Sequence, residues 1–504
     1  TYGDVMLNLS KTFKEKFSLD AHIGASIKDN RFDELSVYGP IAGAPNIFNV
    51  VNLDKSQKKT PKTGWHEQTQ SFFYSLELGW KSQLFVTTTG RNDWASQLAN
   101  SPQKSFFYPS VGVSWLPSST FNFPEKFNYL KIRASWASVA NPFPRELTIA
   151  THPYDDTISG WDDKSNYPIG QLYPERTKTW ELGFDARFLH GFTLSASWYR
   201  ADTYNQTFNP NLSASSGYSD IYIQTGHVRN TGVEASLGYD HQWKNWNWNS
   251  QFTFSWNKNK IIELCKEWYN PITEETITMN RLQISKLGRA KFILKEGGSM
   301  GDLYSTTDLR RDDKGNIEID EGGNVVVEDN LPDMKLGSVF PDYNLAWRNS
   351  VSWKNLNLGF LVTARIGGIV NSLTQANMDL FGVSEATAAA RDAGGALVNG
   401  RSLVNPETWY TAIASQGGIP QYYTYSATNV RLQELSLGYT IPRKWLHNIC
   451  SITVSFVGRN LWMMYCKAPF DPEAVASTNN FYQGMDYFMM PSTRNLGFNI
   501  NIKF

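Results

Sequence analysis

Residues that could catalyse a reaction are scattered through this chain and form no familiar catalytic pattern. The histidines show no metal-ligand spacing, and no HExxH, Cys-x-x-Cys, G-x-S-x-G or Walker sequence occurs. Adjacent carboxylates at Asp155-Asp156 and Asp162-Asp163 fall in predicted loops, where solvated turn residues are common. The segment Asp312–Asn316 lacks the alternating spacing of a calcium loop and predicts a hairpin turn. The sequence therefore predicts no enzyme, no metal site and no cofactor.

Aromatic side chains in the predicted long loops are better candidates for recognition. Such rings can stack on sugar faces or pack against peptide side chains. The candidate ligand-binding residues are Trp161, Trp268, Tyr269, Trp409, Tyr410, Tyr422, Tyr423, Tyr425, Tyr482 and Tyr487. The same rings could instead pack loop against loop or against a partner, because a long loop must bury side chains to stay ordered.

The elements that position these loops show a two-residue period. In the last ten residues, Asn495–Phe504, every even position is apolar and every odd position is polar or glycine. About ten such residues form one membrane-crossing strand. The same period predicts about seventeen strands. They span residues 2–12, 17–29, 65–80, 82–93, 106–117, 129–140, 175–189, 192–208, 227–243, 246–263, 287–296, 299–308, 342–354, 357–369, 428–442, 451–465 and 494–504.

The connections between these strands alternate between short and long. Short ones such as Lys14–Lys16 and His190–Gly191 alternate with long segments such as 30–64 and 370–427. An outer-membrane barrel has this asymmetry, with tight periplasmic turns, long outer loops and aromatic girdles. Tryptophans gather beside the short connections, at Trp80, Trp115, Trp243, Trp246, Trp248, Trp353 and Trp445. Ordinary core tryptophans are the alternative interpretation.

Composition agrees with an all-β transmembrane antiparallel barrel. The 504 residues carry 47 basic and 47 acidic side chains, a balance that argues against a nucleic-acid-binding surface. No apolar run approaches the roughly 18 residues that a spanning helix needs, whereas half of every barrel strand is polar. Alternation predicts a polar lumen face of mixed charge, with Arg133, Glu181, Arg187, Arg348 and Glu434 pointing inward.

The parity of the strands predicts a partial barrel. If Phe504 ends on the periplasmic side, an odd strand count places Thr1 outside, whereas bacterial single-chain barrels have even counts and both termini inside. We therefore expect residues 1–504 to be the C-terminal part of a larger barrel.

The chain resembles the SusC/RagA family of TonB-dependent outer-membrane transporters in motifs that follow the family's order. The matching stretches are Thr89–Trp94, Phe107–Val111, Leu130–Trp136, Pro174–Phe184, Arg229–Glu234, Glu296–Gly298 with Gly301, Arg431–Tyr439, Gly458–Leu461, Asp471–Glu473 and Gly497-Phe498. This resemblance implies a bacterial outer-membrane barrel of about 22 strands, which would leave about five strands and the plug domain outside this chain. It also implies active import of an oligosaccharide or oligopeptide, with TonB and a SusD/RagB-like surface lipoprotein as partners.

Two other functions remain open from the sequence alone. A passive porin-like channel would share the barrel and its polar lumen. A soluble β-rich carbohydrate-binding protein would share the loop aromatics but would need no detergent for extraction.

Overall fold

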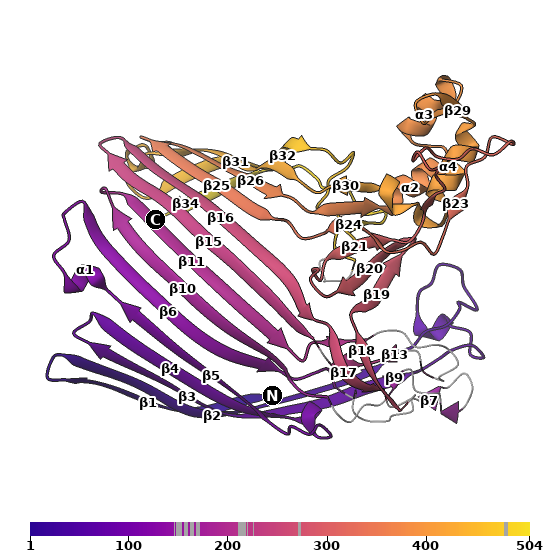
Figure 1. The fold of residues 1–504 in the computed structure, drawn as a ribbon. Helices are drawn as coiled ribbons and strands as arrows, with labels where there is room; N and C mark the ends of the chain where they lie inside the picture. Colours follow the sequence, from indigo (N-terminus) through magenta and orange to yellow (C-terminus); the bar gives the residue numbers. More distant parts are fainter. Residues whose placement is uncertain are drawn as a thin grey trace.

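The computed structural model describes residues 1–145, 147, 154–155, 160–161, 166–167, 172–209, 218, 220–224, 226–270, 274–477 and 482–504. One antiparallel sheet of fifteen strands dominates it, and each strand pairs with the next (Figure 1). Its strands are β1 (Tyr2–Phe13), β2 (Phe17–Leu35), β3 (Lys62–Trp80), β4 (Leu84–Ala95), β5 (Phe106–Trp115), β6 (Phe127–Asn141), β10 (Glu175–Phe188), β11 (Phe192–Tyr204), β15 (His227–Trp243), β16 (Trp246–Glu263), β25 (Tyr343–Trp353), β26 (Leu356–Ile366), β31 (Asn429–Ile441), β32 (Ser451–Cys466) and β34 (Asn495–Lys503).

The prediction of about seventeen barrel strands was therefore too high. The segments predicted at 287–296 and 299–308 do form strands, but these belong to a separate four-stranded sheet in the loop region. Their apolar residues are buried against other loops on both faces, as Phe292, Ile293 and Leu294 show, and a short apolar strand in the sequence does not reveal which sheet it joins. The short connection at Gly297-Gly298 accordingly lies among the loops. Fifteen is also odd, so the expectation of a partial barrel stays a prediction.

The remaining elements lie mainly in the long connections. The small four-stranded sheet contains β19 (Arg281–Leu287), β20 (Ala290–Lys295), β21 (Asp302–Ser305) and β24 (Met334–Ser338). The helices are α1 (Pro117–Thr120), α2 (Leu373–Leu380), α3 (Glu385–Asp392) and α4 (Pro406–Ala414). Short strands complete the loops: β7 (Tyr154–Asp155), β8 (Gly160–Trp161), β9 (Asn166–Tyr167), β12 (Thr207–Phe208), β13 (Asp220–Ile221), β14 (Ile223–Gln224), β17 (Cys265–Asn270), β18 (Glu275–Met279), β22 (Asp308–Leu309), β23 (Val327–Glu328), β27 (Ile369–Ser372), β28 (Ala396–Val398), β29 (Ser402–Val404), β30 (Thr424–Ser426) and β33 (Met485–Asp486).

The two ends of the main sheet differ as the connection lengths predict. Tight turns lie together at one end, and the long loops with α2–α4 lie at the other (Figure 1). Lys14 and Glu15, in the first tight turn, have φ of 49° and 55°, the left-handed pair of a type I′ hairpin turn. The C-terminus lies at the turn end, and β1 starts at the loop end, as the sequence predicts.

The two faces of the sheet also differ. On β10, Trp180 and Leu182 point outward with 56% and 52% of their surface exposed, while Glu181 faces inward beside Arg133 of β6. The predicted girdle tryptophans are likewise exposed beside the tight turns, and Trp246 stacks on Trp353 with ring centroids 5.7 Å apart. An apolar outer face that no protein covers is the face that lipid would solvate.

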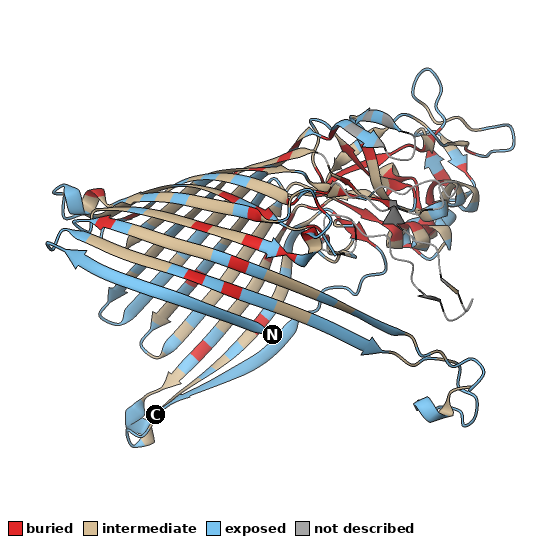
Figure 2. Ribbon diagram, turned by 90° about the horizontal axis from the view of Figure 1, so that it is seen from below, coloured by how far each residue is buried: buried red, intermediate tan, exposed pale blue. Residues whose placement is uncertain are grey.

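Buried residues gather in the loop region and are sparse in the sheet (Figure 2). The loop clusters include Phe292, Leu303 and Val339 around the small sheet, and Tyr423, Ile419 and Ile413 beneath the helices. In the described part of the chain, no helix combines the length and apolar character needed to cross a membrane.

Candidate functional site

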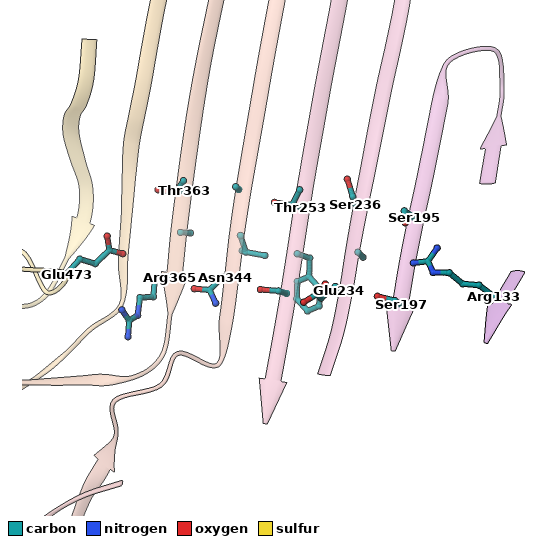
Figure 3. Close-up of a pocket in the computed structure, with 16 residues that line it drawn as sticks. Arg133, Ser195, Ser197, Glu234, Ser236, Thr253, Asn344, Thr363, Arg365 and Glu473 are labelled. Carbon is teal, nitrogen blue, oxygen red and sulfur yellow. The ribbon is translucent and has the colours of Figure 1, made fainter. Parts of the chain in front are cut away.

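The inner face of the main sheet contains a hollow of about 580 Å³. Figure 3 shows Arg133 on one side of it and Arg365 with Glu473 on the other. Between them, most of the labelled lining side chains are small and polar: Ser195, Ser197, Ser236, Thr253, Asn344 and Thr363, together with Glu234. Hydroxyl, amide and charged groups of both signs suit a hydrated solute, because each group can exchange hydrogen bonds with water or ligand.

Arg133 forms the charged centre of one side of this hollow. Its Nη1 donates to Asp185 Oδ2 at 2.6 Å, and its Nε lies 3.6 Å from Glu181 Oε1. Register and alternation place Arg187, Arg348 and Glu434 on the same face, as the sequence predicts. The inner face therefore has charges of both signs held by the strands themselves.

Arg365 forms the opposite side, near the loop end of β26. Its Nη2 donates to the backbone oxygen of Val339 at 2.9 Å. Its buried Nε has no hydrogen-bond acceptor among the described residues. An unpaired buried guanidinium nitrogen is costly, so this nitrogen is a strong candidate to bind an acceptor from a solute or another polypeptide.

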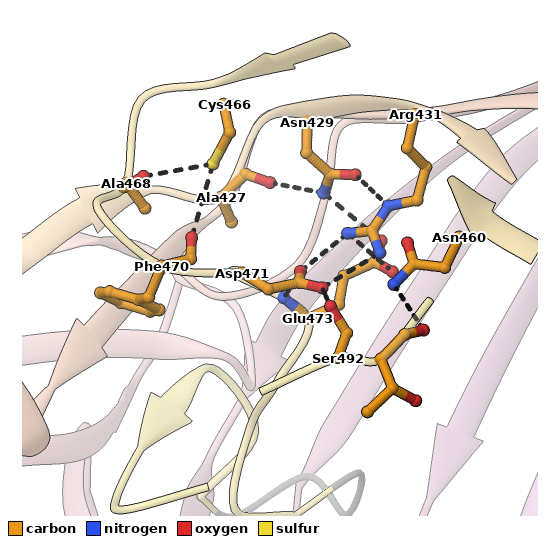
Figure 4. A network of polar contacts seen from close by, with 11 residues as sticks. Ala427, Asn429, Arg431, Asn460, Cys466, Ala468, Phe470, Asp471, Glu473 and Ser492 are labelled. Carbon is orange, nitrogen blue, oxygen red and sulfur yellow. Dashed lines mark hydrogen bonds and ion pairs between the residues drawn. The ribbon is translucent and has the colours of Figure 1, made fainter. Parts of the chain in front are cut away.

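A buried ion-pair network joins the last long loop to β31 (Figure 4). The Arg431 guanidinium donates to both Asp471 oxygens, at 2.8 and 3.1 Å, and lies 3.3 Å from Glu473 Oε2. Its Nε donates to Asn429 Oδ1 at 3.1 Å. Burial alone would raise the pKa of Asp471, but hydrogen bonds from Arg431 and Ser492 outweigh it and hold that pKa below its usual range. The network fixes Glu473 where it lines the hollow.

Four of the predicted ligand-binding aromatics belong to one packed cluster, Trp409 and Tyr410 on α4 and Tyr422 and Tyr423 in the segment after it. Tyr423 is buried, and its hydroxyl donates to Asp379 Oδ2 at 3.0 Å. Burial, followed by the Asp379 charge, raises the pKa of Tyr423 far above its usual range, so it remains a donor at neutral pH. Trp409 and Tyr422 meet edge to face, with centroids 5.9 Å apart, and Tyr410 packs on the same cluster. These rings adopt the loop-against-loop packing that the sequence left open.

Tyr410 also borders a second hollow of about 450 Å³ between the helices. Phe381, Asp379, Arg391 and Glu407 share its lining, so this hollow combines two rings with charges of both signs. Of the four clustered aromatics, Tyr410 therefore retains a surface that could touch a ligand.

The other predicted aromatics lie in different places. Tyr425 packs edge to face on Phe470, and burial with the Asp379 charge raises its pKa to about 12. Tyr269, Tyr482 and Tyr487 are exposed on the loops. The side chains of Trp161 and Trp268 lie outside the described residues. Ligand binding by the ten predicted aromatic residues stays a prediction.

Sequence reasoning did not single out Arg365 or Glu234 as lining residues of the hollow. Alternation identifies an inward-facing residue but not which inward residues, far apart in sequence, surround the same space. In the described part of the chain, no group of histidine, cysteine and carboxylate side chains could hold a metal ion. Asp312 accepts backbone hydrogen bonds from Lys314 and Asn316 within a hairpin, as predicted.

Comparison with known proteins gives consistent matches. The family model "TonB dependent receptor-like, beta-barrel" matches residues 1–461. TonB-dependent receptor P3 of Formosa agariphila is 26% identical over 99% of this chain and 52% of its own length. TonB-dependent receptor SusC of Bacteroides thetaiotaomicron is 21% identical over 74% of this chain and 38% of its own length. The structure of the RagAB peptide transporter superposes with a TM-score of 0.75 at 18% identity, over 100% of this chain and 56% of the other.

These matches confirm several predictions from the sequence. The resemblance to SusC/RagA-type proteins, the antiparallel barrel fold and the outer-membrane location are confirmed. The matched family and the curated relatives are receptors, in agreement with the prediction that the chain is not an enzyme. The chain spans about half the length of three curated relatives that it matches, at 52%, 50% and 52%.

Proposed function

Because the chain belongs to the TonB-dependent receptor-like β-barrel family, we propose that it is part of an active importer of a bulky nutrient across the bacterial outer membrane. The polar hollow on the inner face supports this most directly. It lies between the loop end and the turn end of the strands and contains mixed charges and hydroxyls. An oligosaccharide or an oligopeptide, both rich in hydrogen-bonding groups, suits this lining.

We propose that further strands and a plug domain complete the transporter. Among the described strands, β1 and β34 pair on one side only, and every residue of both is exposed. Unpaired edges cannot face lipid, because no water is available there to satisfy their backbone groups. Additional strands joining β34 to β1 would remove both edges, and a plug would give the charged inner face a partner.

We propose a SusD/RagB-like surface lipoprotein as the outer partner and TonB as the energy-coupling partner. The helical loops at the outer end carry large exposed apolar side chains: Met378, Phe381, Val383, Leu397 and Leu403. A surface lipoprotein could cover these residues and close the entrance over a captured ligand. TonB would act on the periplasmic side through a segment outside this chain.

Uptake by the intact protein tests this function. Proteoliposomes or cells containing the intact protein should import labelled oligosaccharide or oligopeptide only when TonB is energised, and should leak neither without it. Free swelling in the absence of TonB would favour the porin-like alternative and contradict active import. Replacing Arg365 with glutamine should reduce uptake of the matching substrate, whereas K81Q in a periplasmic turn should not.

A further inference from the structure

Four neighbouring strands carry a group of cations on their outward face, toward the loop end. The proposed import pathway on the inner face uses none of them. The members of this basic cluster are Lys178 on β10, Arg200 on β11, Arg229 on β15, and Lys258 and Lys260 on β16. Their placement follows from the pairing of these strands.

Two adjacent rows of the sheet bring the cations together. In one row, Lys178 pairs with Asp202, Asp202 with Arg229, and Arg229 with Lys260. In the next row, Arg200 pairs with Trp180 on one side, and on the other side a single residue of β15 separates it from Lys258. Neighbouring strands lie about 4.8 Å apart, so these side chains share one small area of the surface.

The cluster lies at the outer edge of the apolar band. Lys178 faces outward like Trp180 and Leu182 on the same strand and lies nearer the loop end. Lys258 has the same relation to Trp256. Ten positions separate Trp256 from the girdle residue Trp246. At about 3.3 Å per residue and a tilt of about 40°, they cover about 25 Å, the height of the apolar band in such barrels. Residues beyond Trp256 therefore lie at the level of the outer headgroups.

The charge of the cluster is only partly balanced within the protein. Asp202 accepts hydrogen bonds from Arg229 at 2.7 Å and Arg200 at 2.9 Å. The lysines Lys178, Lys258 and Lys260 are all exposed. The two rows thus hold five cations against one carboxylate. The next row toward the loop end adds one cation, Arg176, and one carboxylate, Glu263, so the excess of positive charge is unchanged.

A surface pocket lies within the cluster. Lys178, Arg200 and Asp202 form its charged part, and Trp180, Leu182 and Trp198 form its apolar part. A ligand with an anionic group beside a hydrocarbon chain matches both parts. A second copy of this chain docking through the same patch is a poorer match, because twofold symmetry would bring like charges together.

We infer that the basic cluster binds the phosphate group of an outer-leaflet lipid. The headgroup phosphate lies against the exposed lysines and Arg200, and an acyl chain lies against Trp180, Leu182 and Trp198. Such a contact anchors this side of the barrel at a fixed depth. It depends on the position of the barrel in the outer membrane and not on the imported substrate.

Lipid binding by the purified intact protein tests the inference. The variant K178Q/K258Q/K260Q removes three cations and leaves Asp202 with both of its arginine partners. The matched control K81Q/K244Q/K354Q removes three lysines from the periplasmic turns. Native mass spectrometry measures retention of added lipid A, of the same lipid without phosphates, and of inorganic phosphate. Heat-modifiable migration on gels verifies that each variant is folded.

We expect the wild type and the turn control to retain lipid A, and the cluster variant to bind it at least about tenfold more weakly. Dephosphorylated lipid should bind weakly to all three proteins, and millimolar inorganic phosphate should not displace lipid A. Equal lipid A retention by cluster variant and wild type would overturn the inference. So would equal binding of the dephosphorylated lipid, displacement by free phosphate, or a dimer that buries these lysines. Uptake is measured separately, so failure of lipid binding leaves the import proposal intact.

Discussion

At the scale of single residues, the Arg431 network shows how a buried charge organises a loop. The side chains of Arg431 and Asp471 are 5% and 9% exposed, and their hydrogen bonds are bidentate. Because the pKa of Asp471 is lowered, its charge stabilises the fold above the unfolded pKa of about 3.9. That contribution is lost only as the pH falls through the lower folded value, so the loop stays clamped at neutral pH.

Replacing Arg431 with glutamine should release the loop that contains Asp471 and Glu473. The change leaves a buried carboxylate without its cation, at a cost of about 3–5 kcal/mol. Hydrogen exchange across residues 467–477 should rise strongly in this variant. The control R459Q breaks the exposed Arg459–Glu434 pair and should change exchange little, because such pairs contribute about 0–1 kcal/mol. Equal exchange in R431Q and wild type would contradict a clamping role.

At the scale of the element, each strand of the main sheet faces lipid on one side and a hydrated interior on the other. Within the apolar band, most outward residues of the main sheet are apolar and exposed, and most inward residues that line the hollow are polar or small. The strands are stabilised by lipid on one side and by a hydrated interior on the other, so alternation along the strand is a structural requirement. Neighbouring positions on one strand should therefore respond oppositely to the same charge.

The adjacent residues Ser236 and Leu237 on β15 test this requirement. Leu237 points outward and is exposed, and Ser236 lines the inner hollow. The variant L237R should lower the free energy of unfolding in bilayers by about 2–4 kcal/mol, the cost of arginine on the lipid face near the midplane. The variant S236R should fold nearly as well as wild type. Similar destabilisation by both would show that the faces are assigned wrongly.

At the scale of the whole molecule, the rigidly paired sheet carries a separately packed layer of loops. The small four-stranded sheet and α2–α4 have their own buried clusters, and the helical loops also carry exposed apolar side chains. Under the proposed function, this arrangement leaves the sheet to span the membrane and the loops to contact ligand and lipoprotein.

The outer-loop residue Phe381 should matter for capture of the proposed lipoprotein. Phe381 is 75% exposed at the end of α2, so F381D should not disturb packing but should weaken an apolar interface. We expect less of the SusD/RagB-like lipoprotein, identified by mass spectrometry, to co-purify from native membranes. The variant I449D, at a comparably exposed residue beside the periplasmic turns, is the control. Unchanged co-purification with F381D would exclude this surface as the contact.

The sequence by itself determined the strands, their facing, and the division into a turn end and a loop end. These features are local, since the two-residue period and the length of each connection depend only on residues close together in the sequence. The tertiary structure alone decided that the strands predicted at 287–296 and 299–308 leave the barrel, because only packing partners distinguish a loop sheet from a membrane strand. It also decided that Tyr423 is buried on Asp379, and that Arg365 and Glu473 share a hollow with Arg133. Such contacts join residues far apart in sequence, and no local period records them.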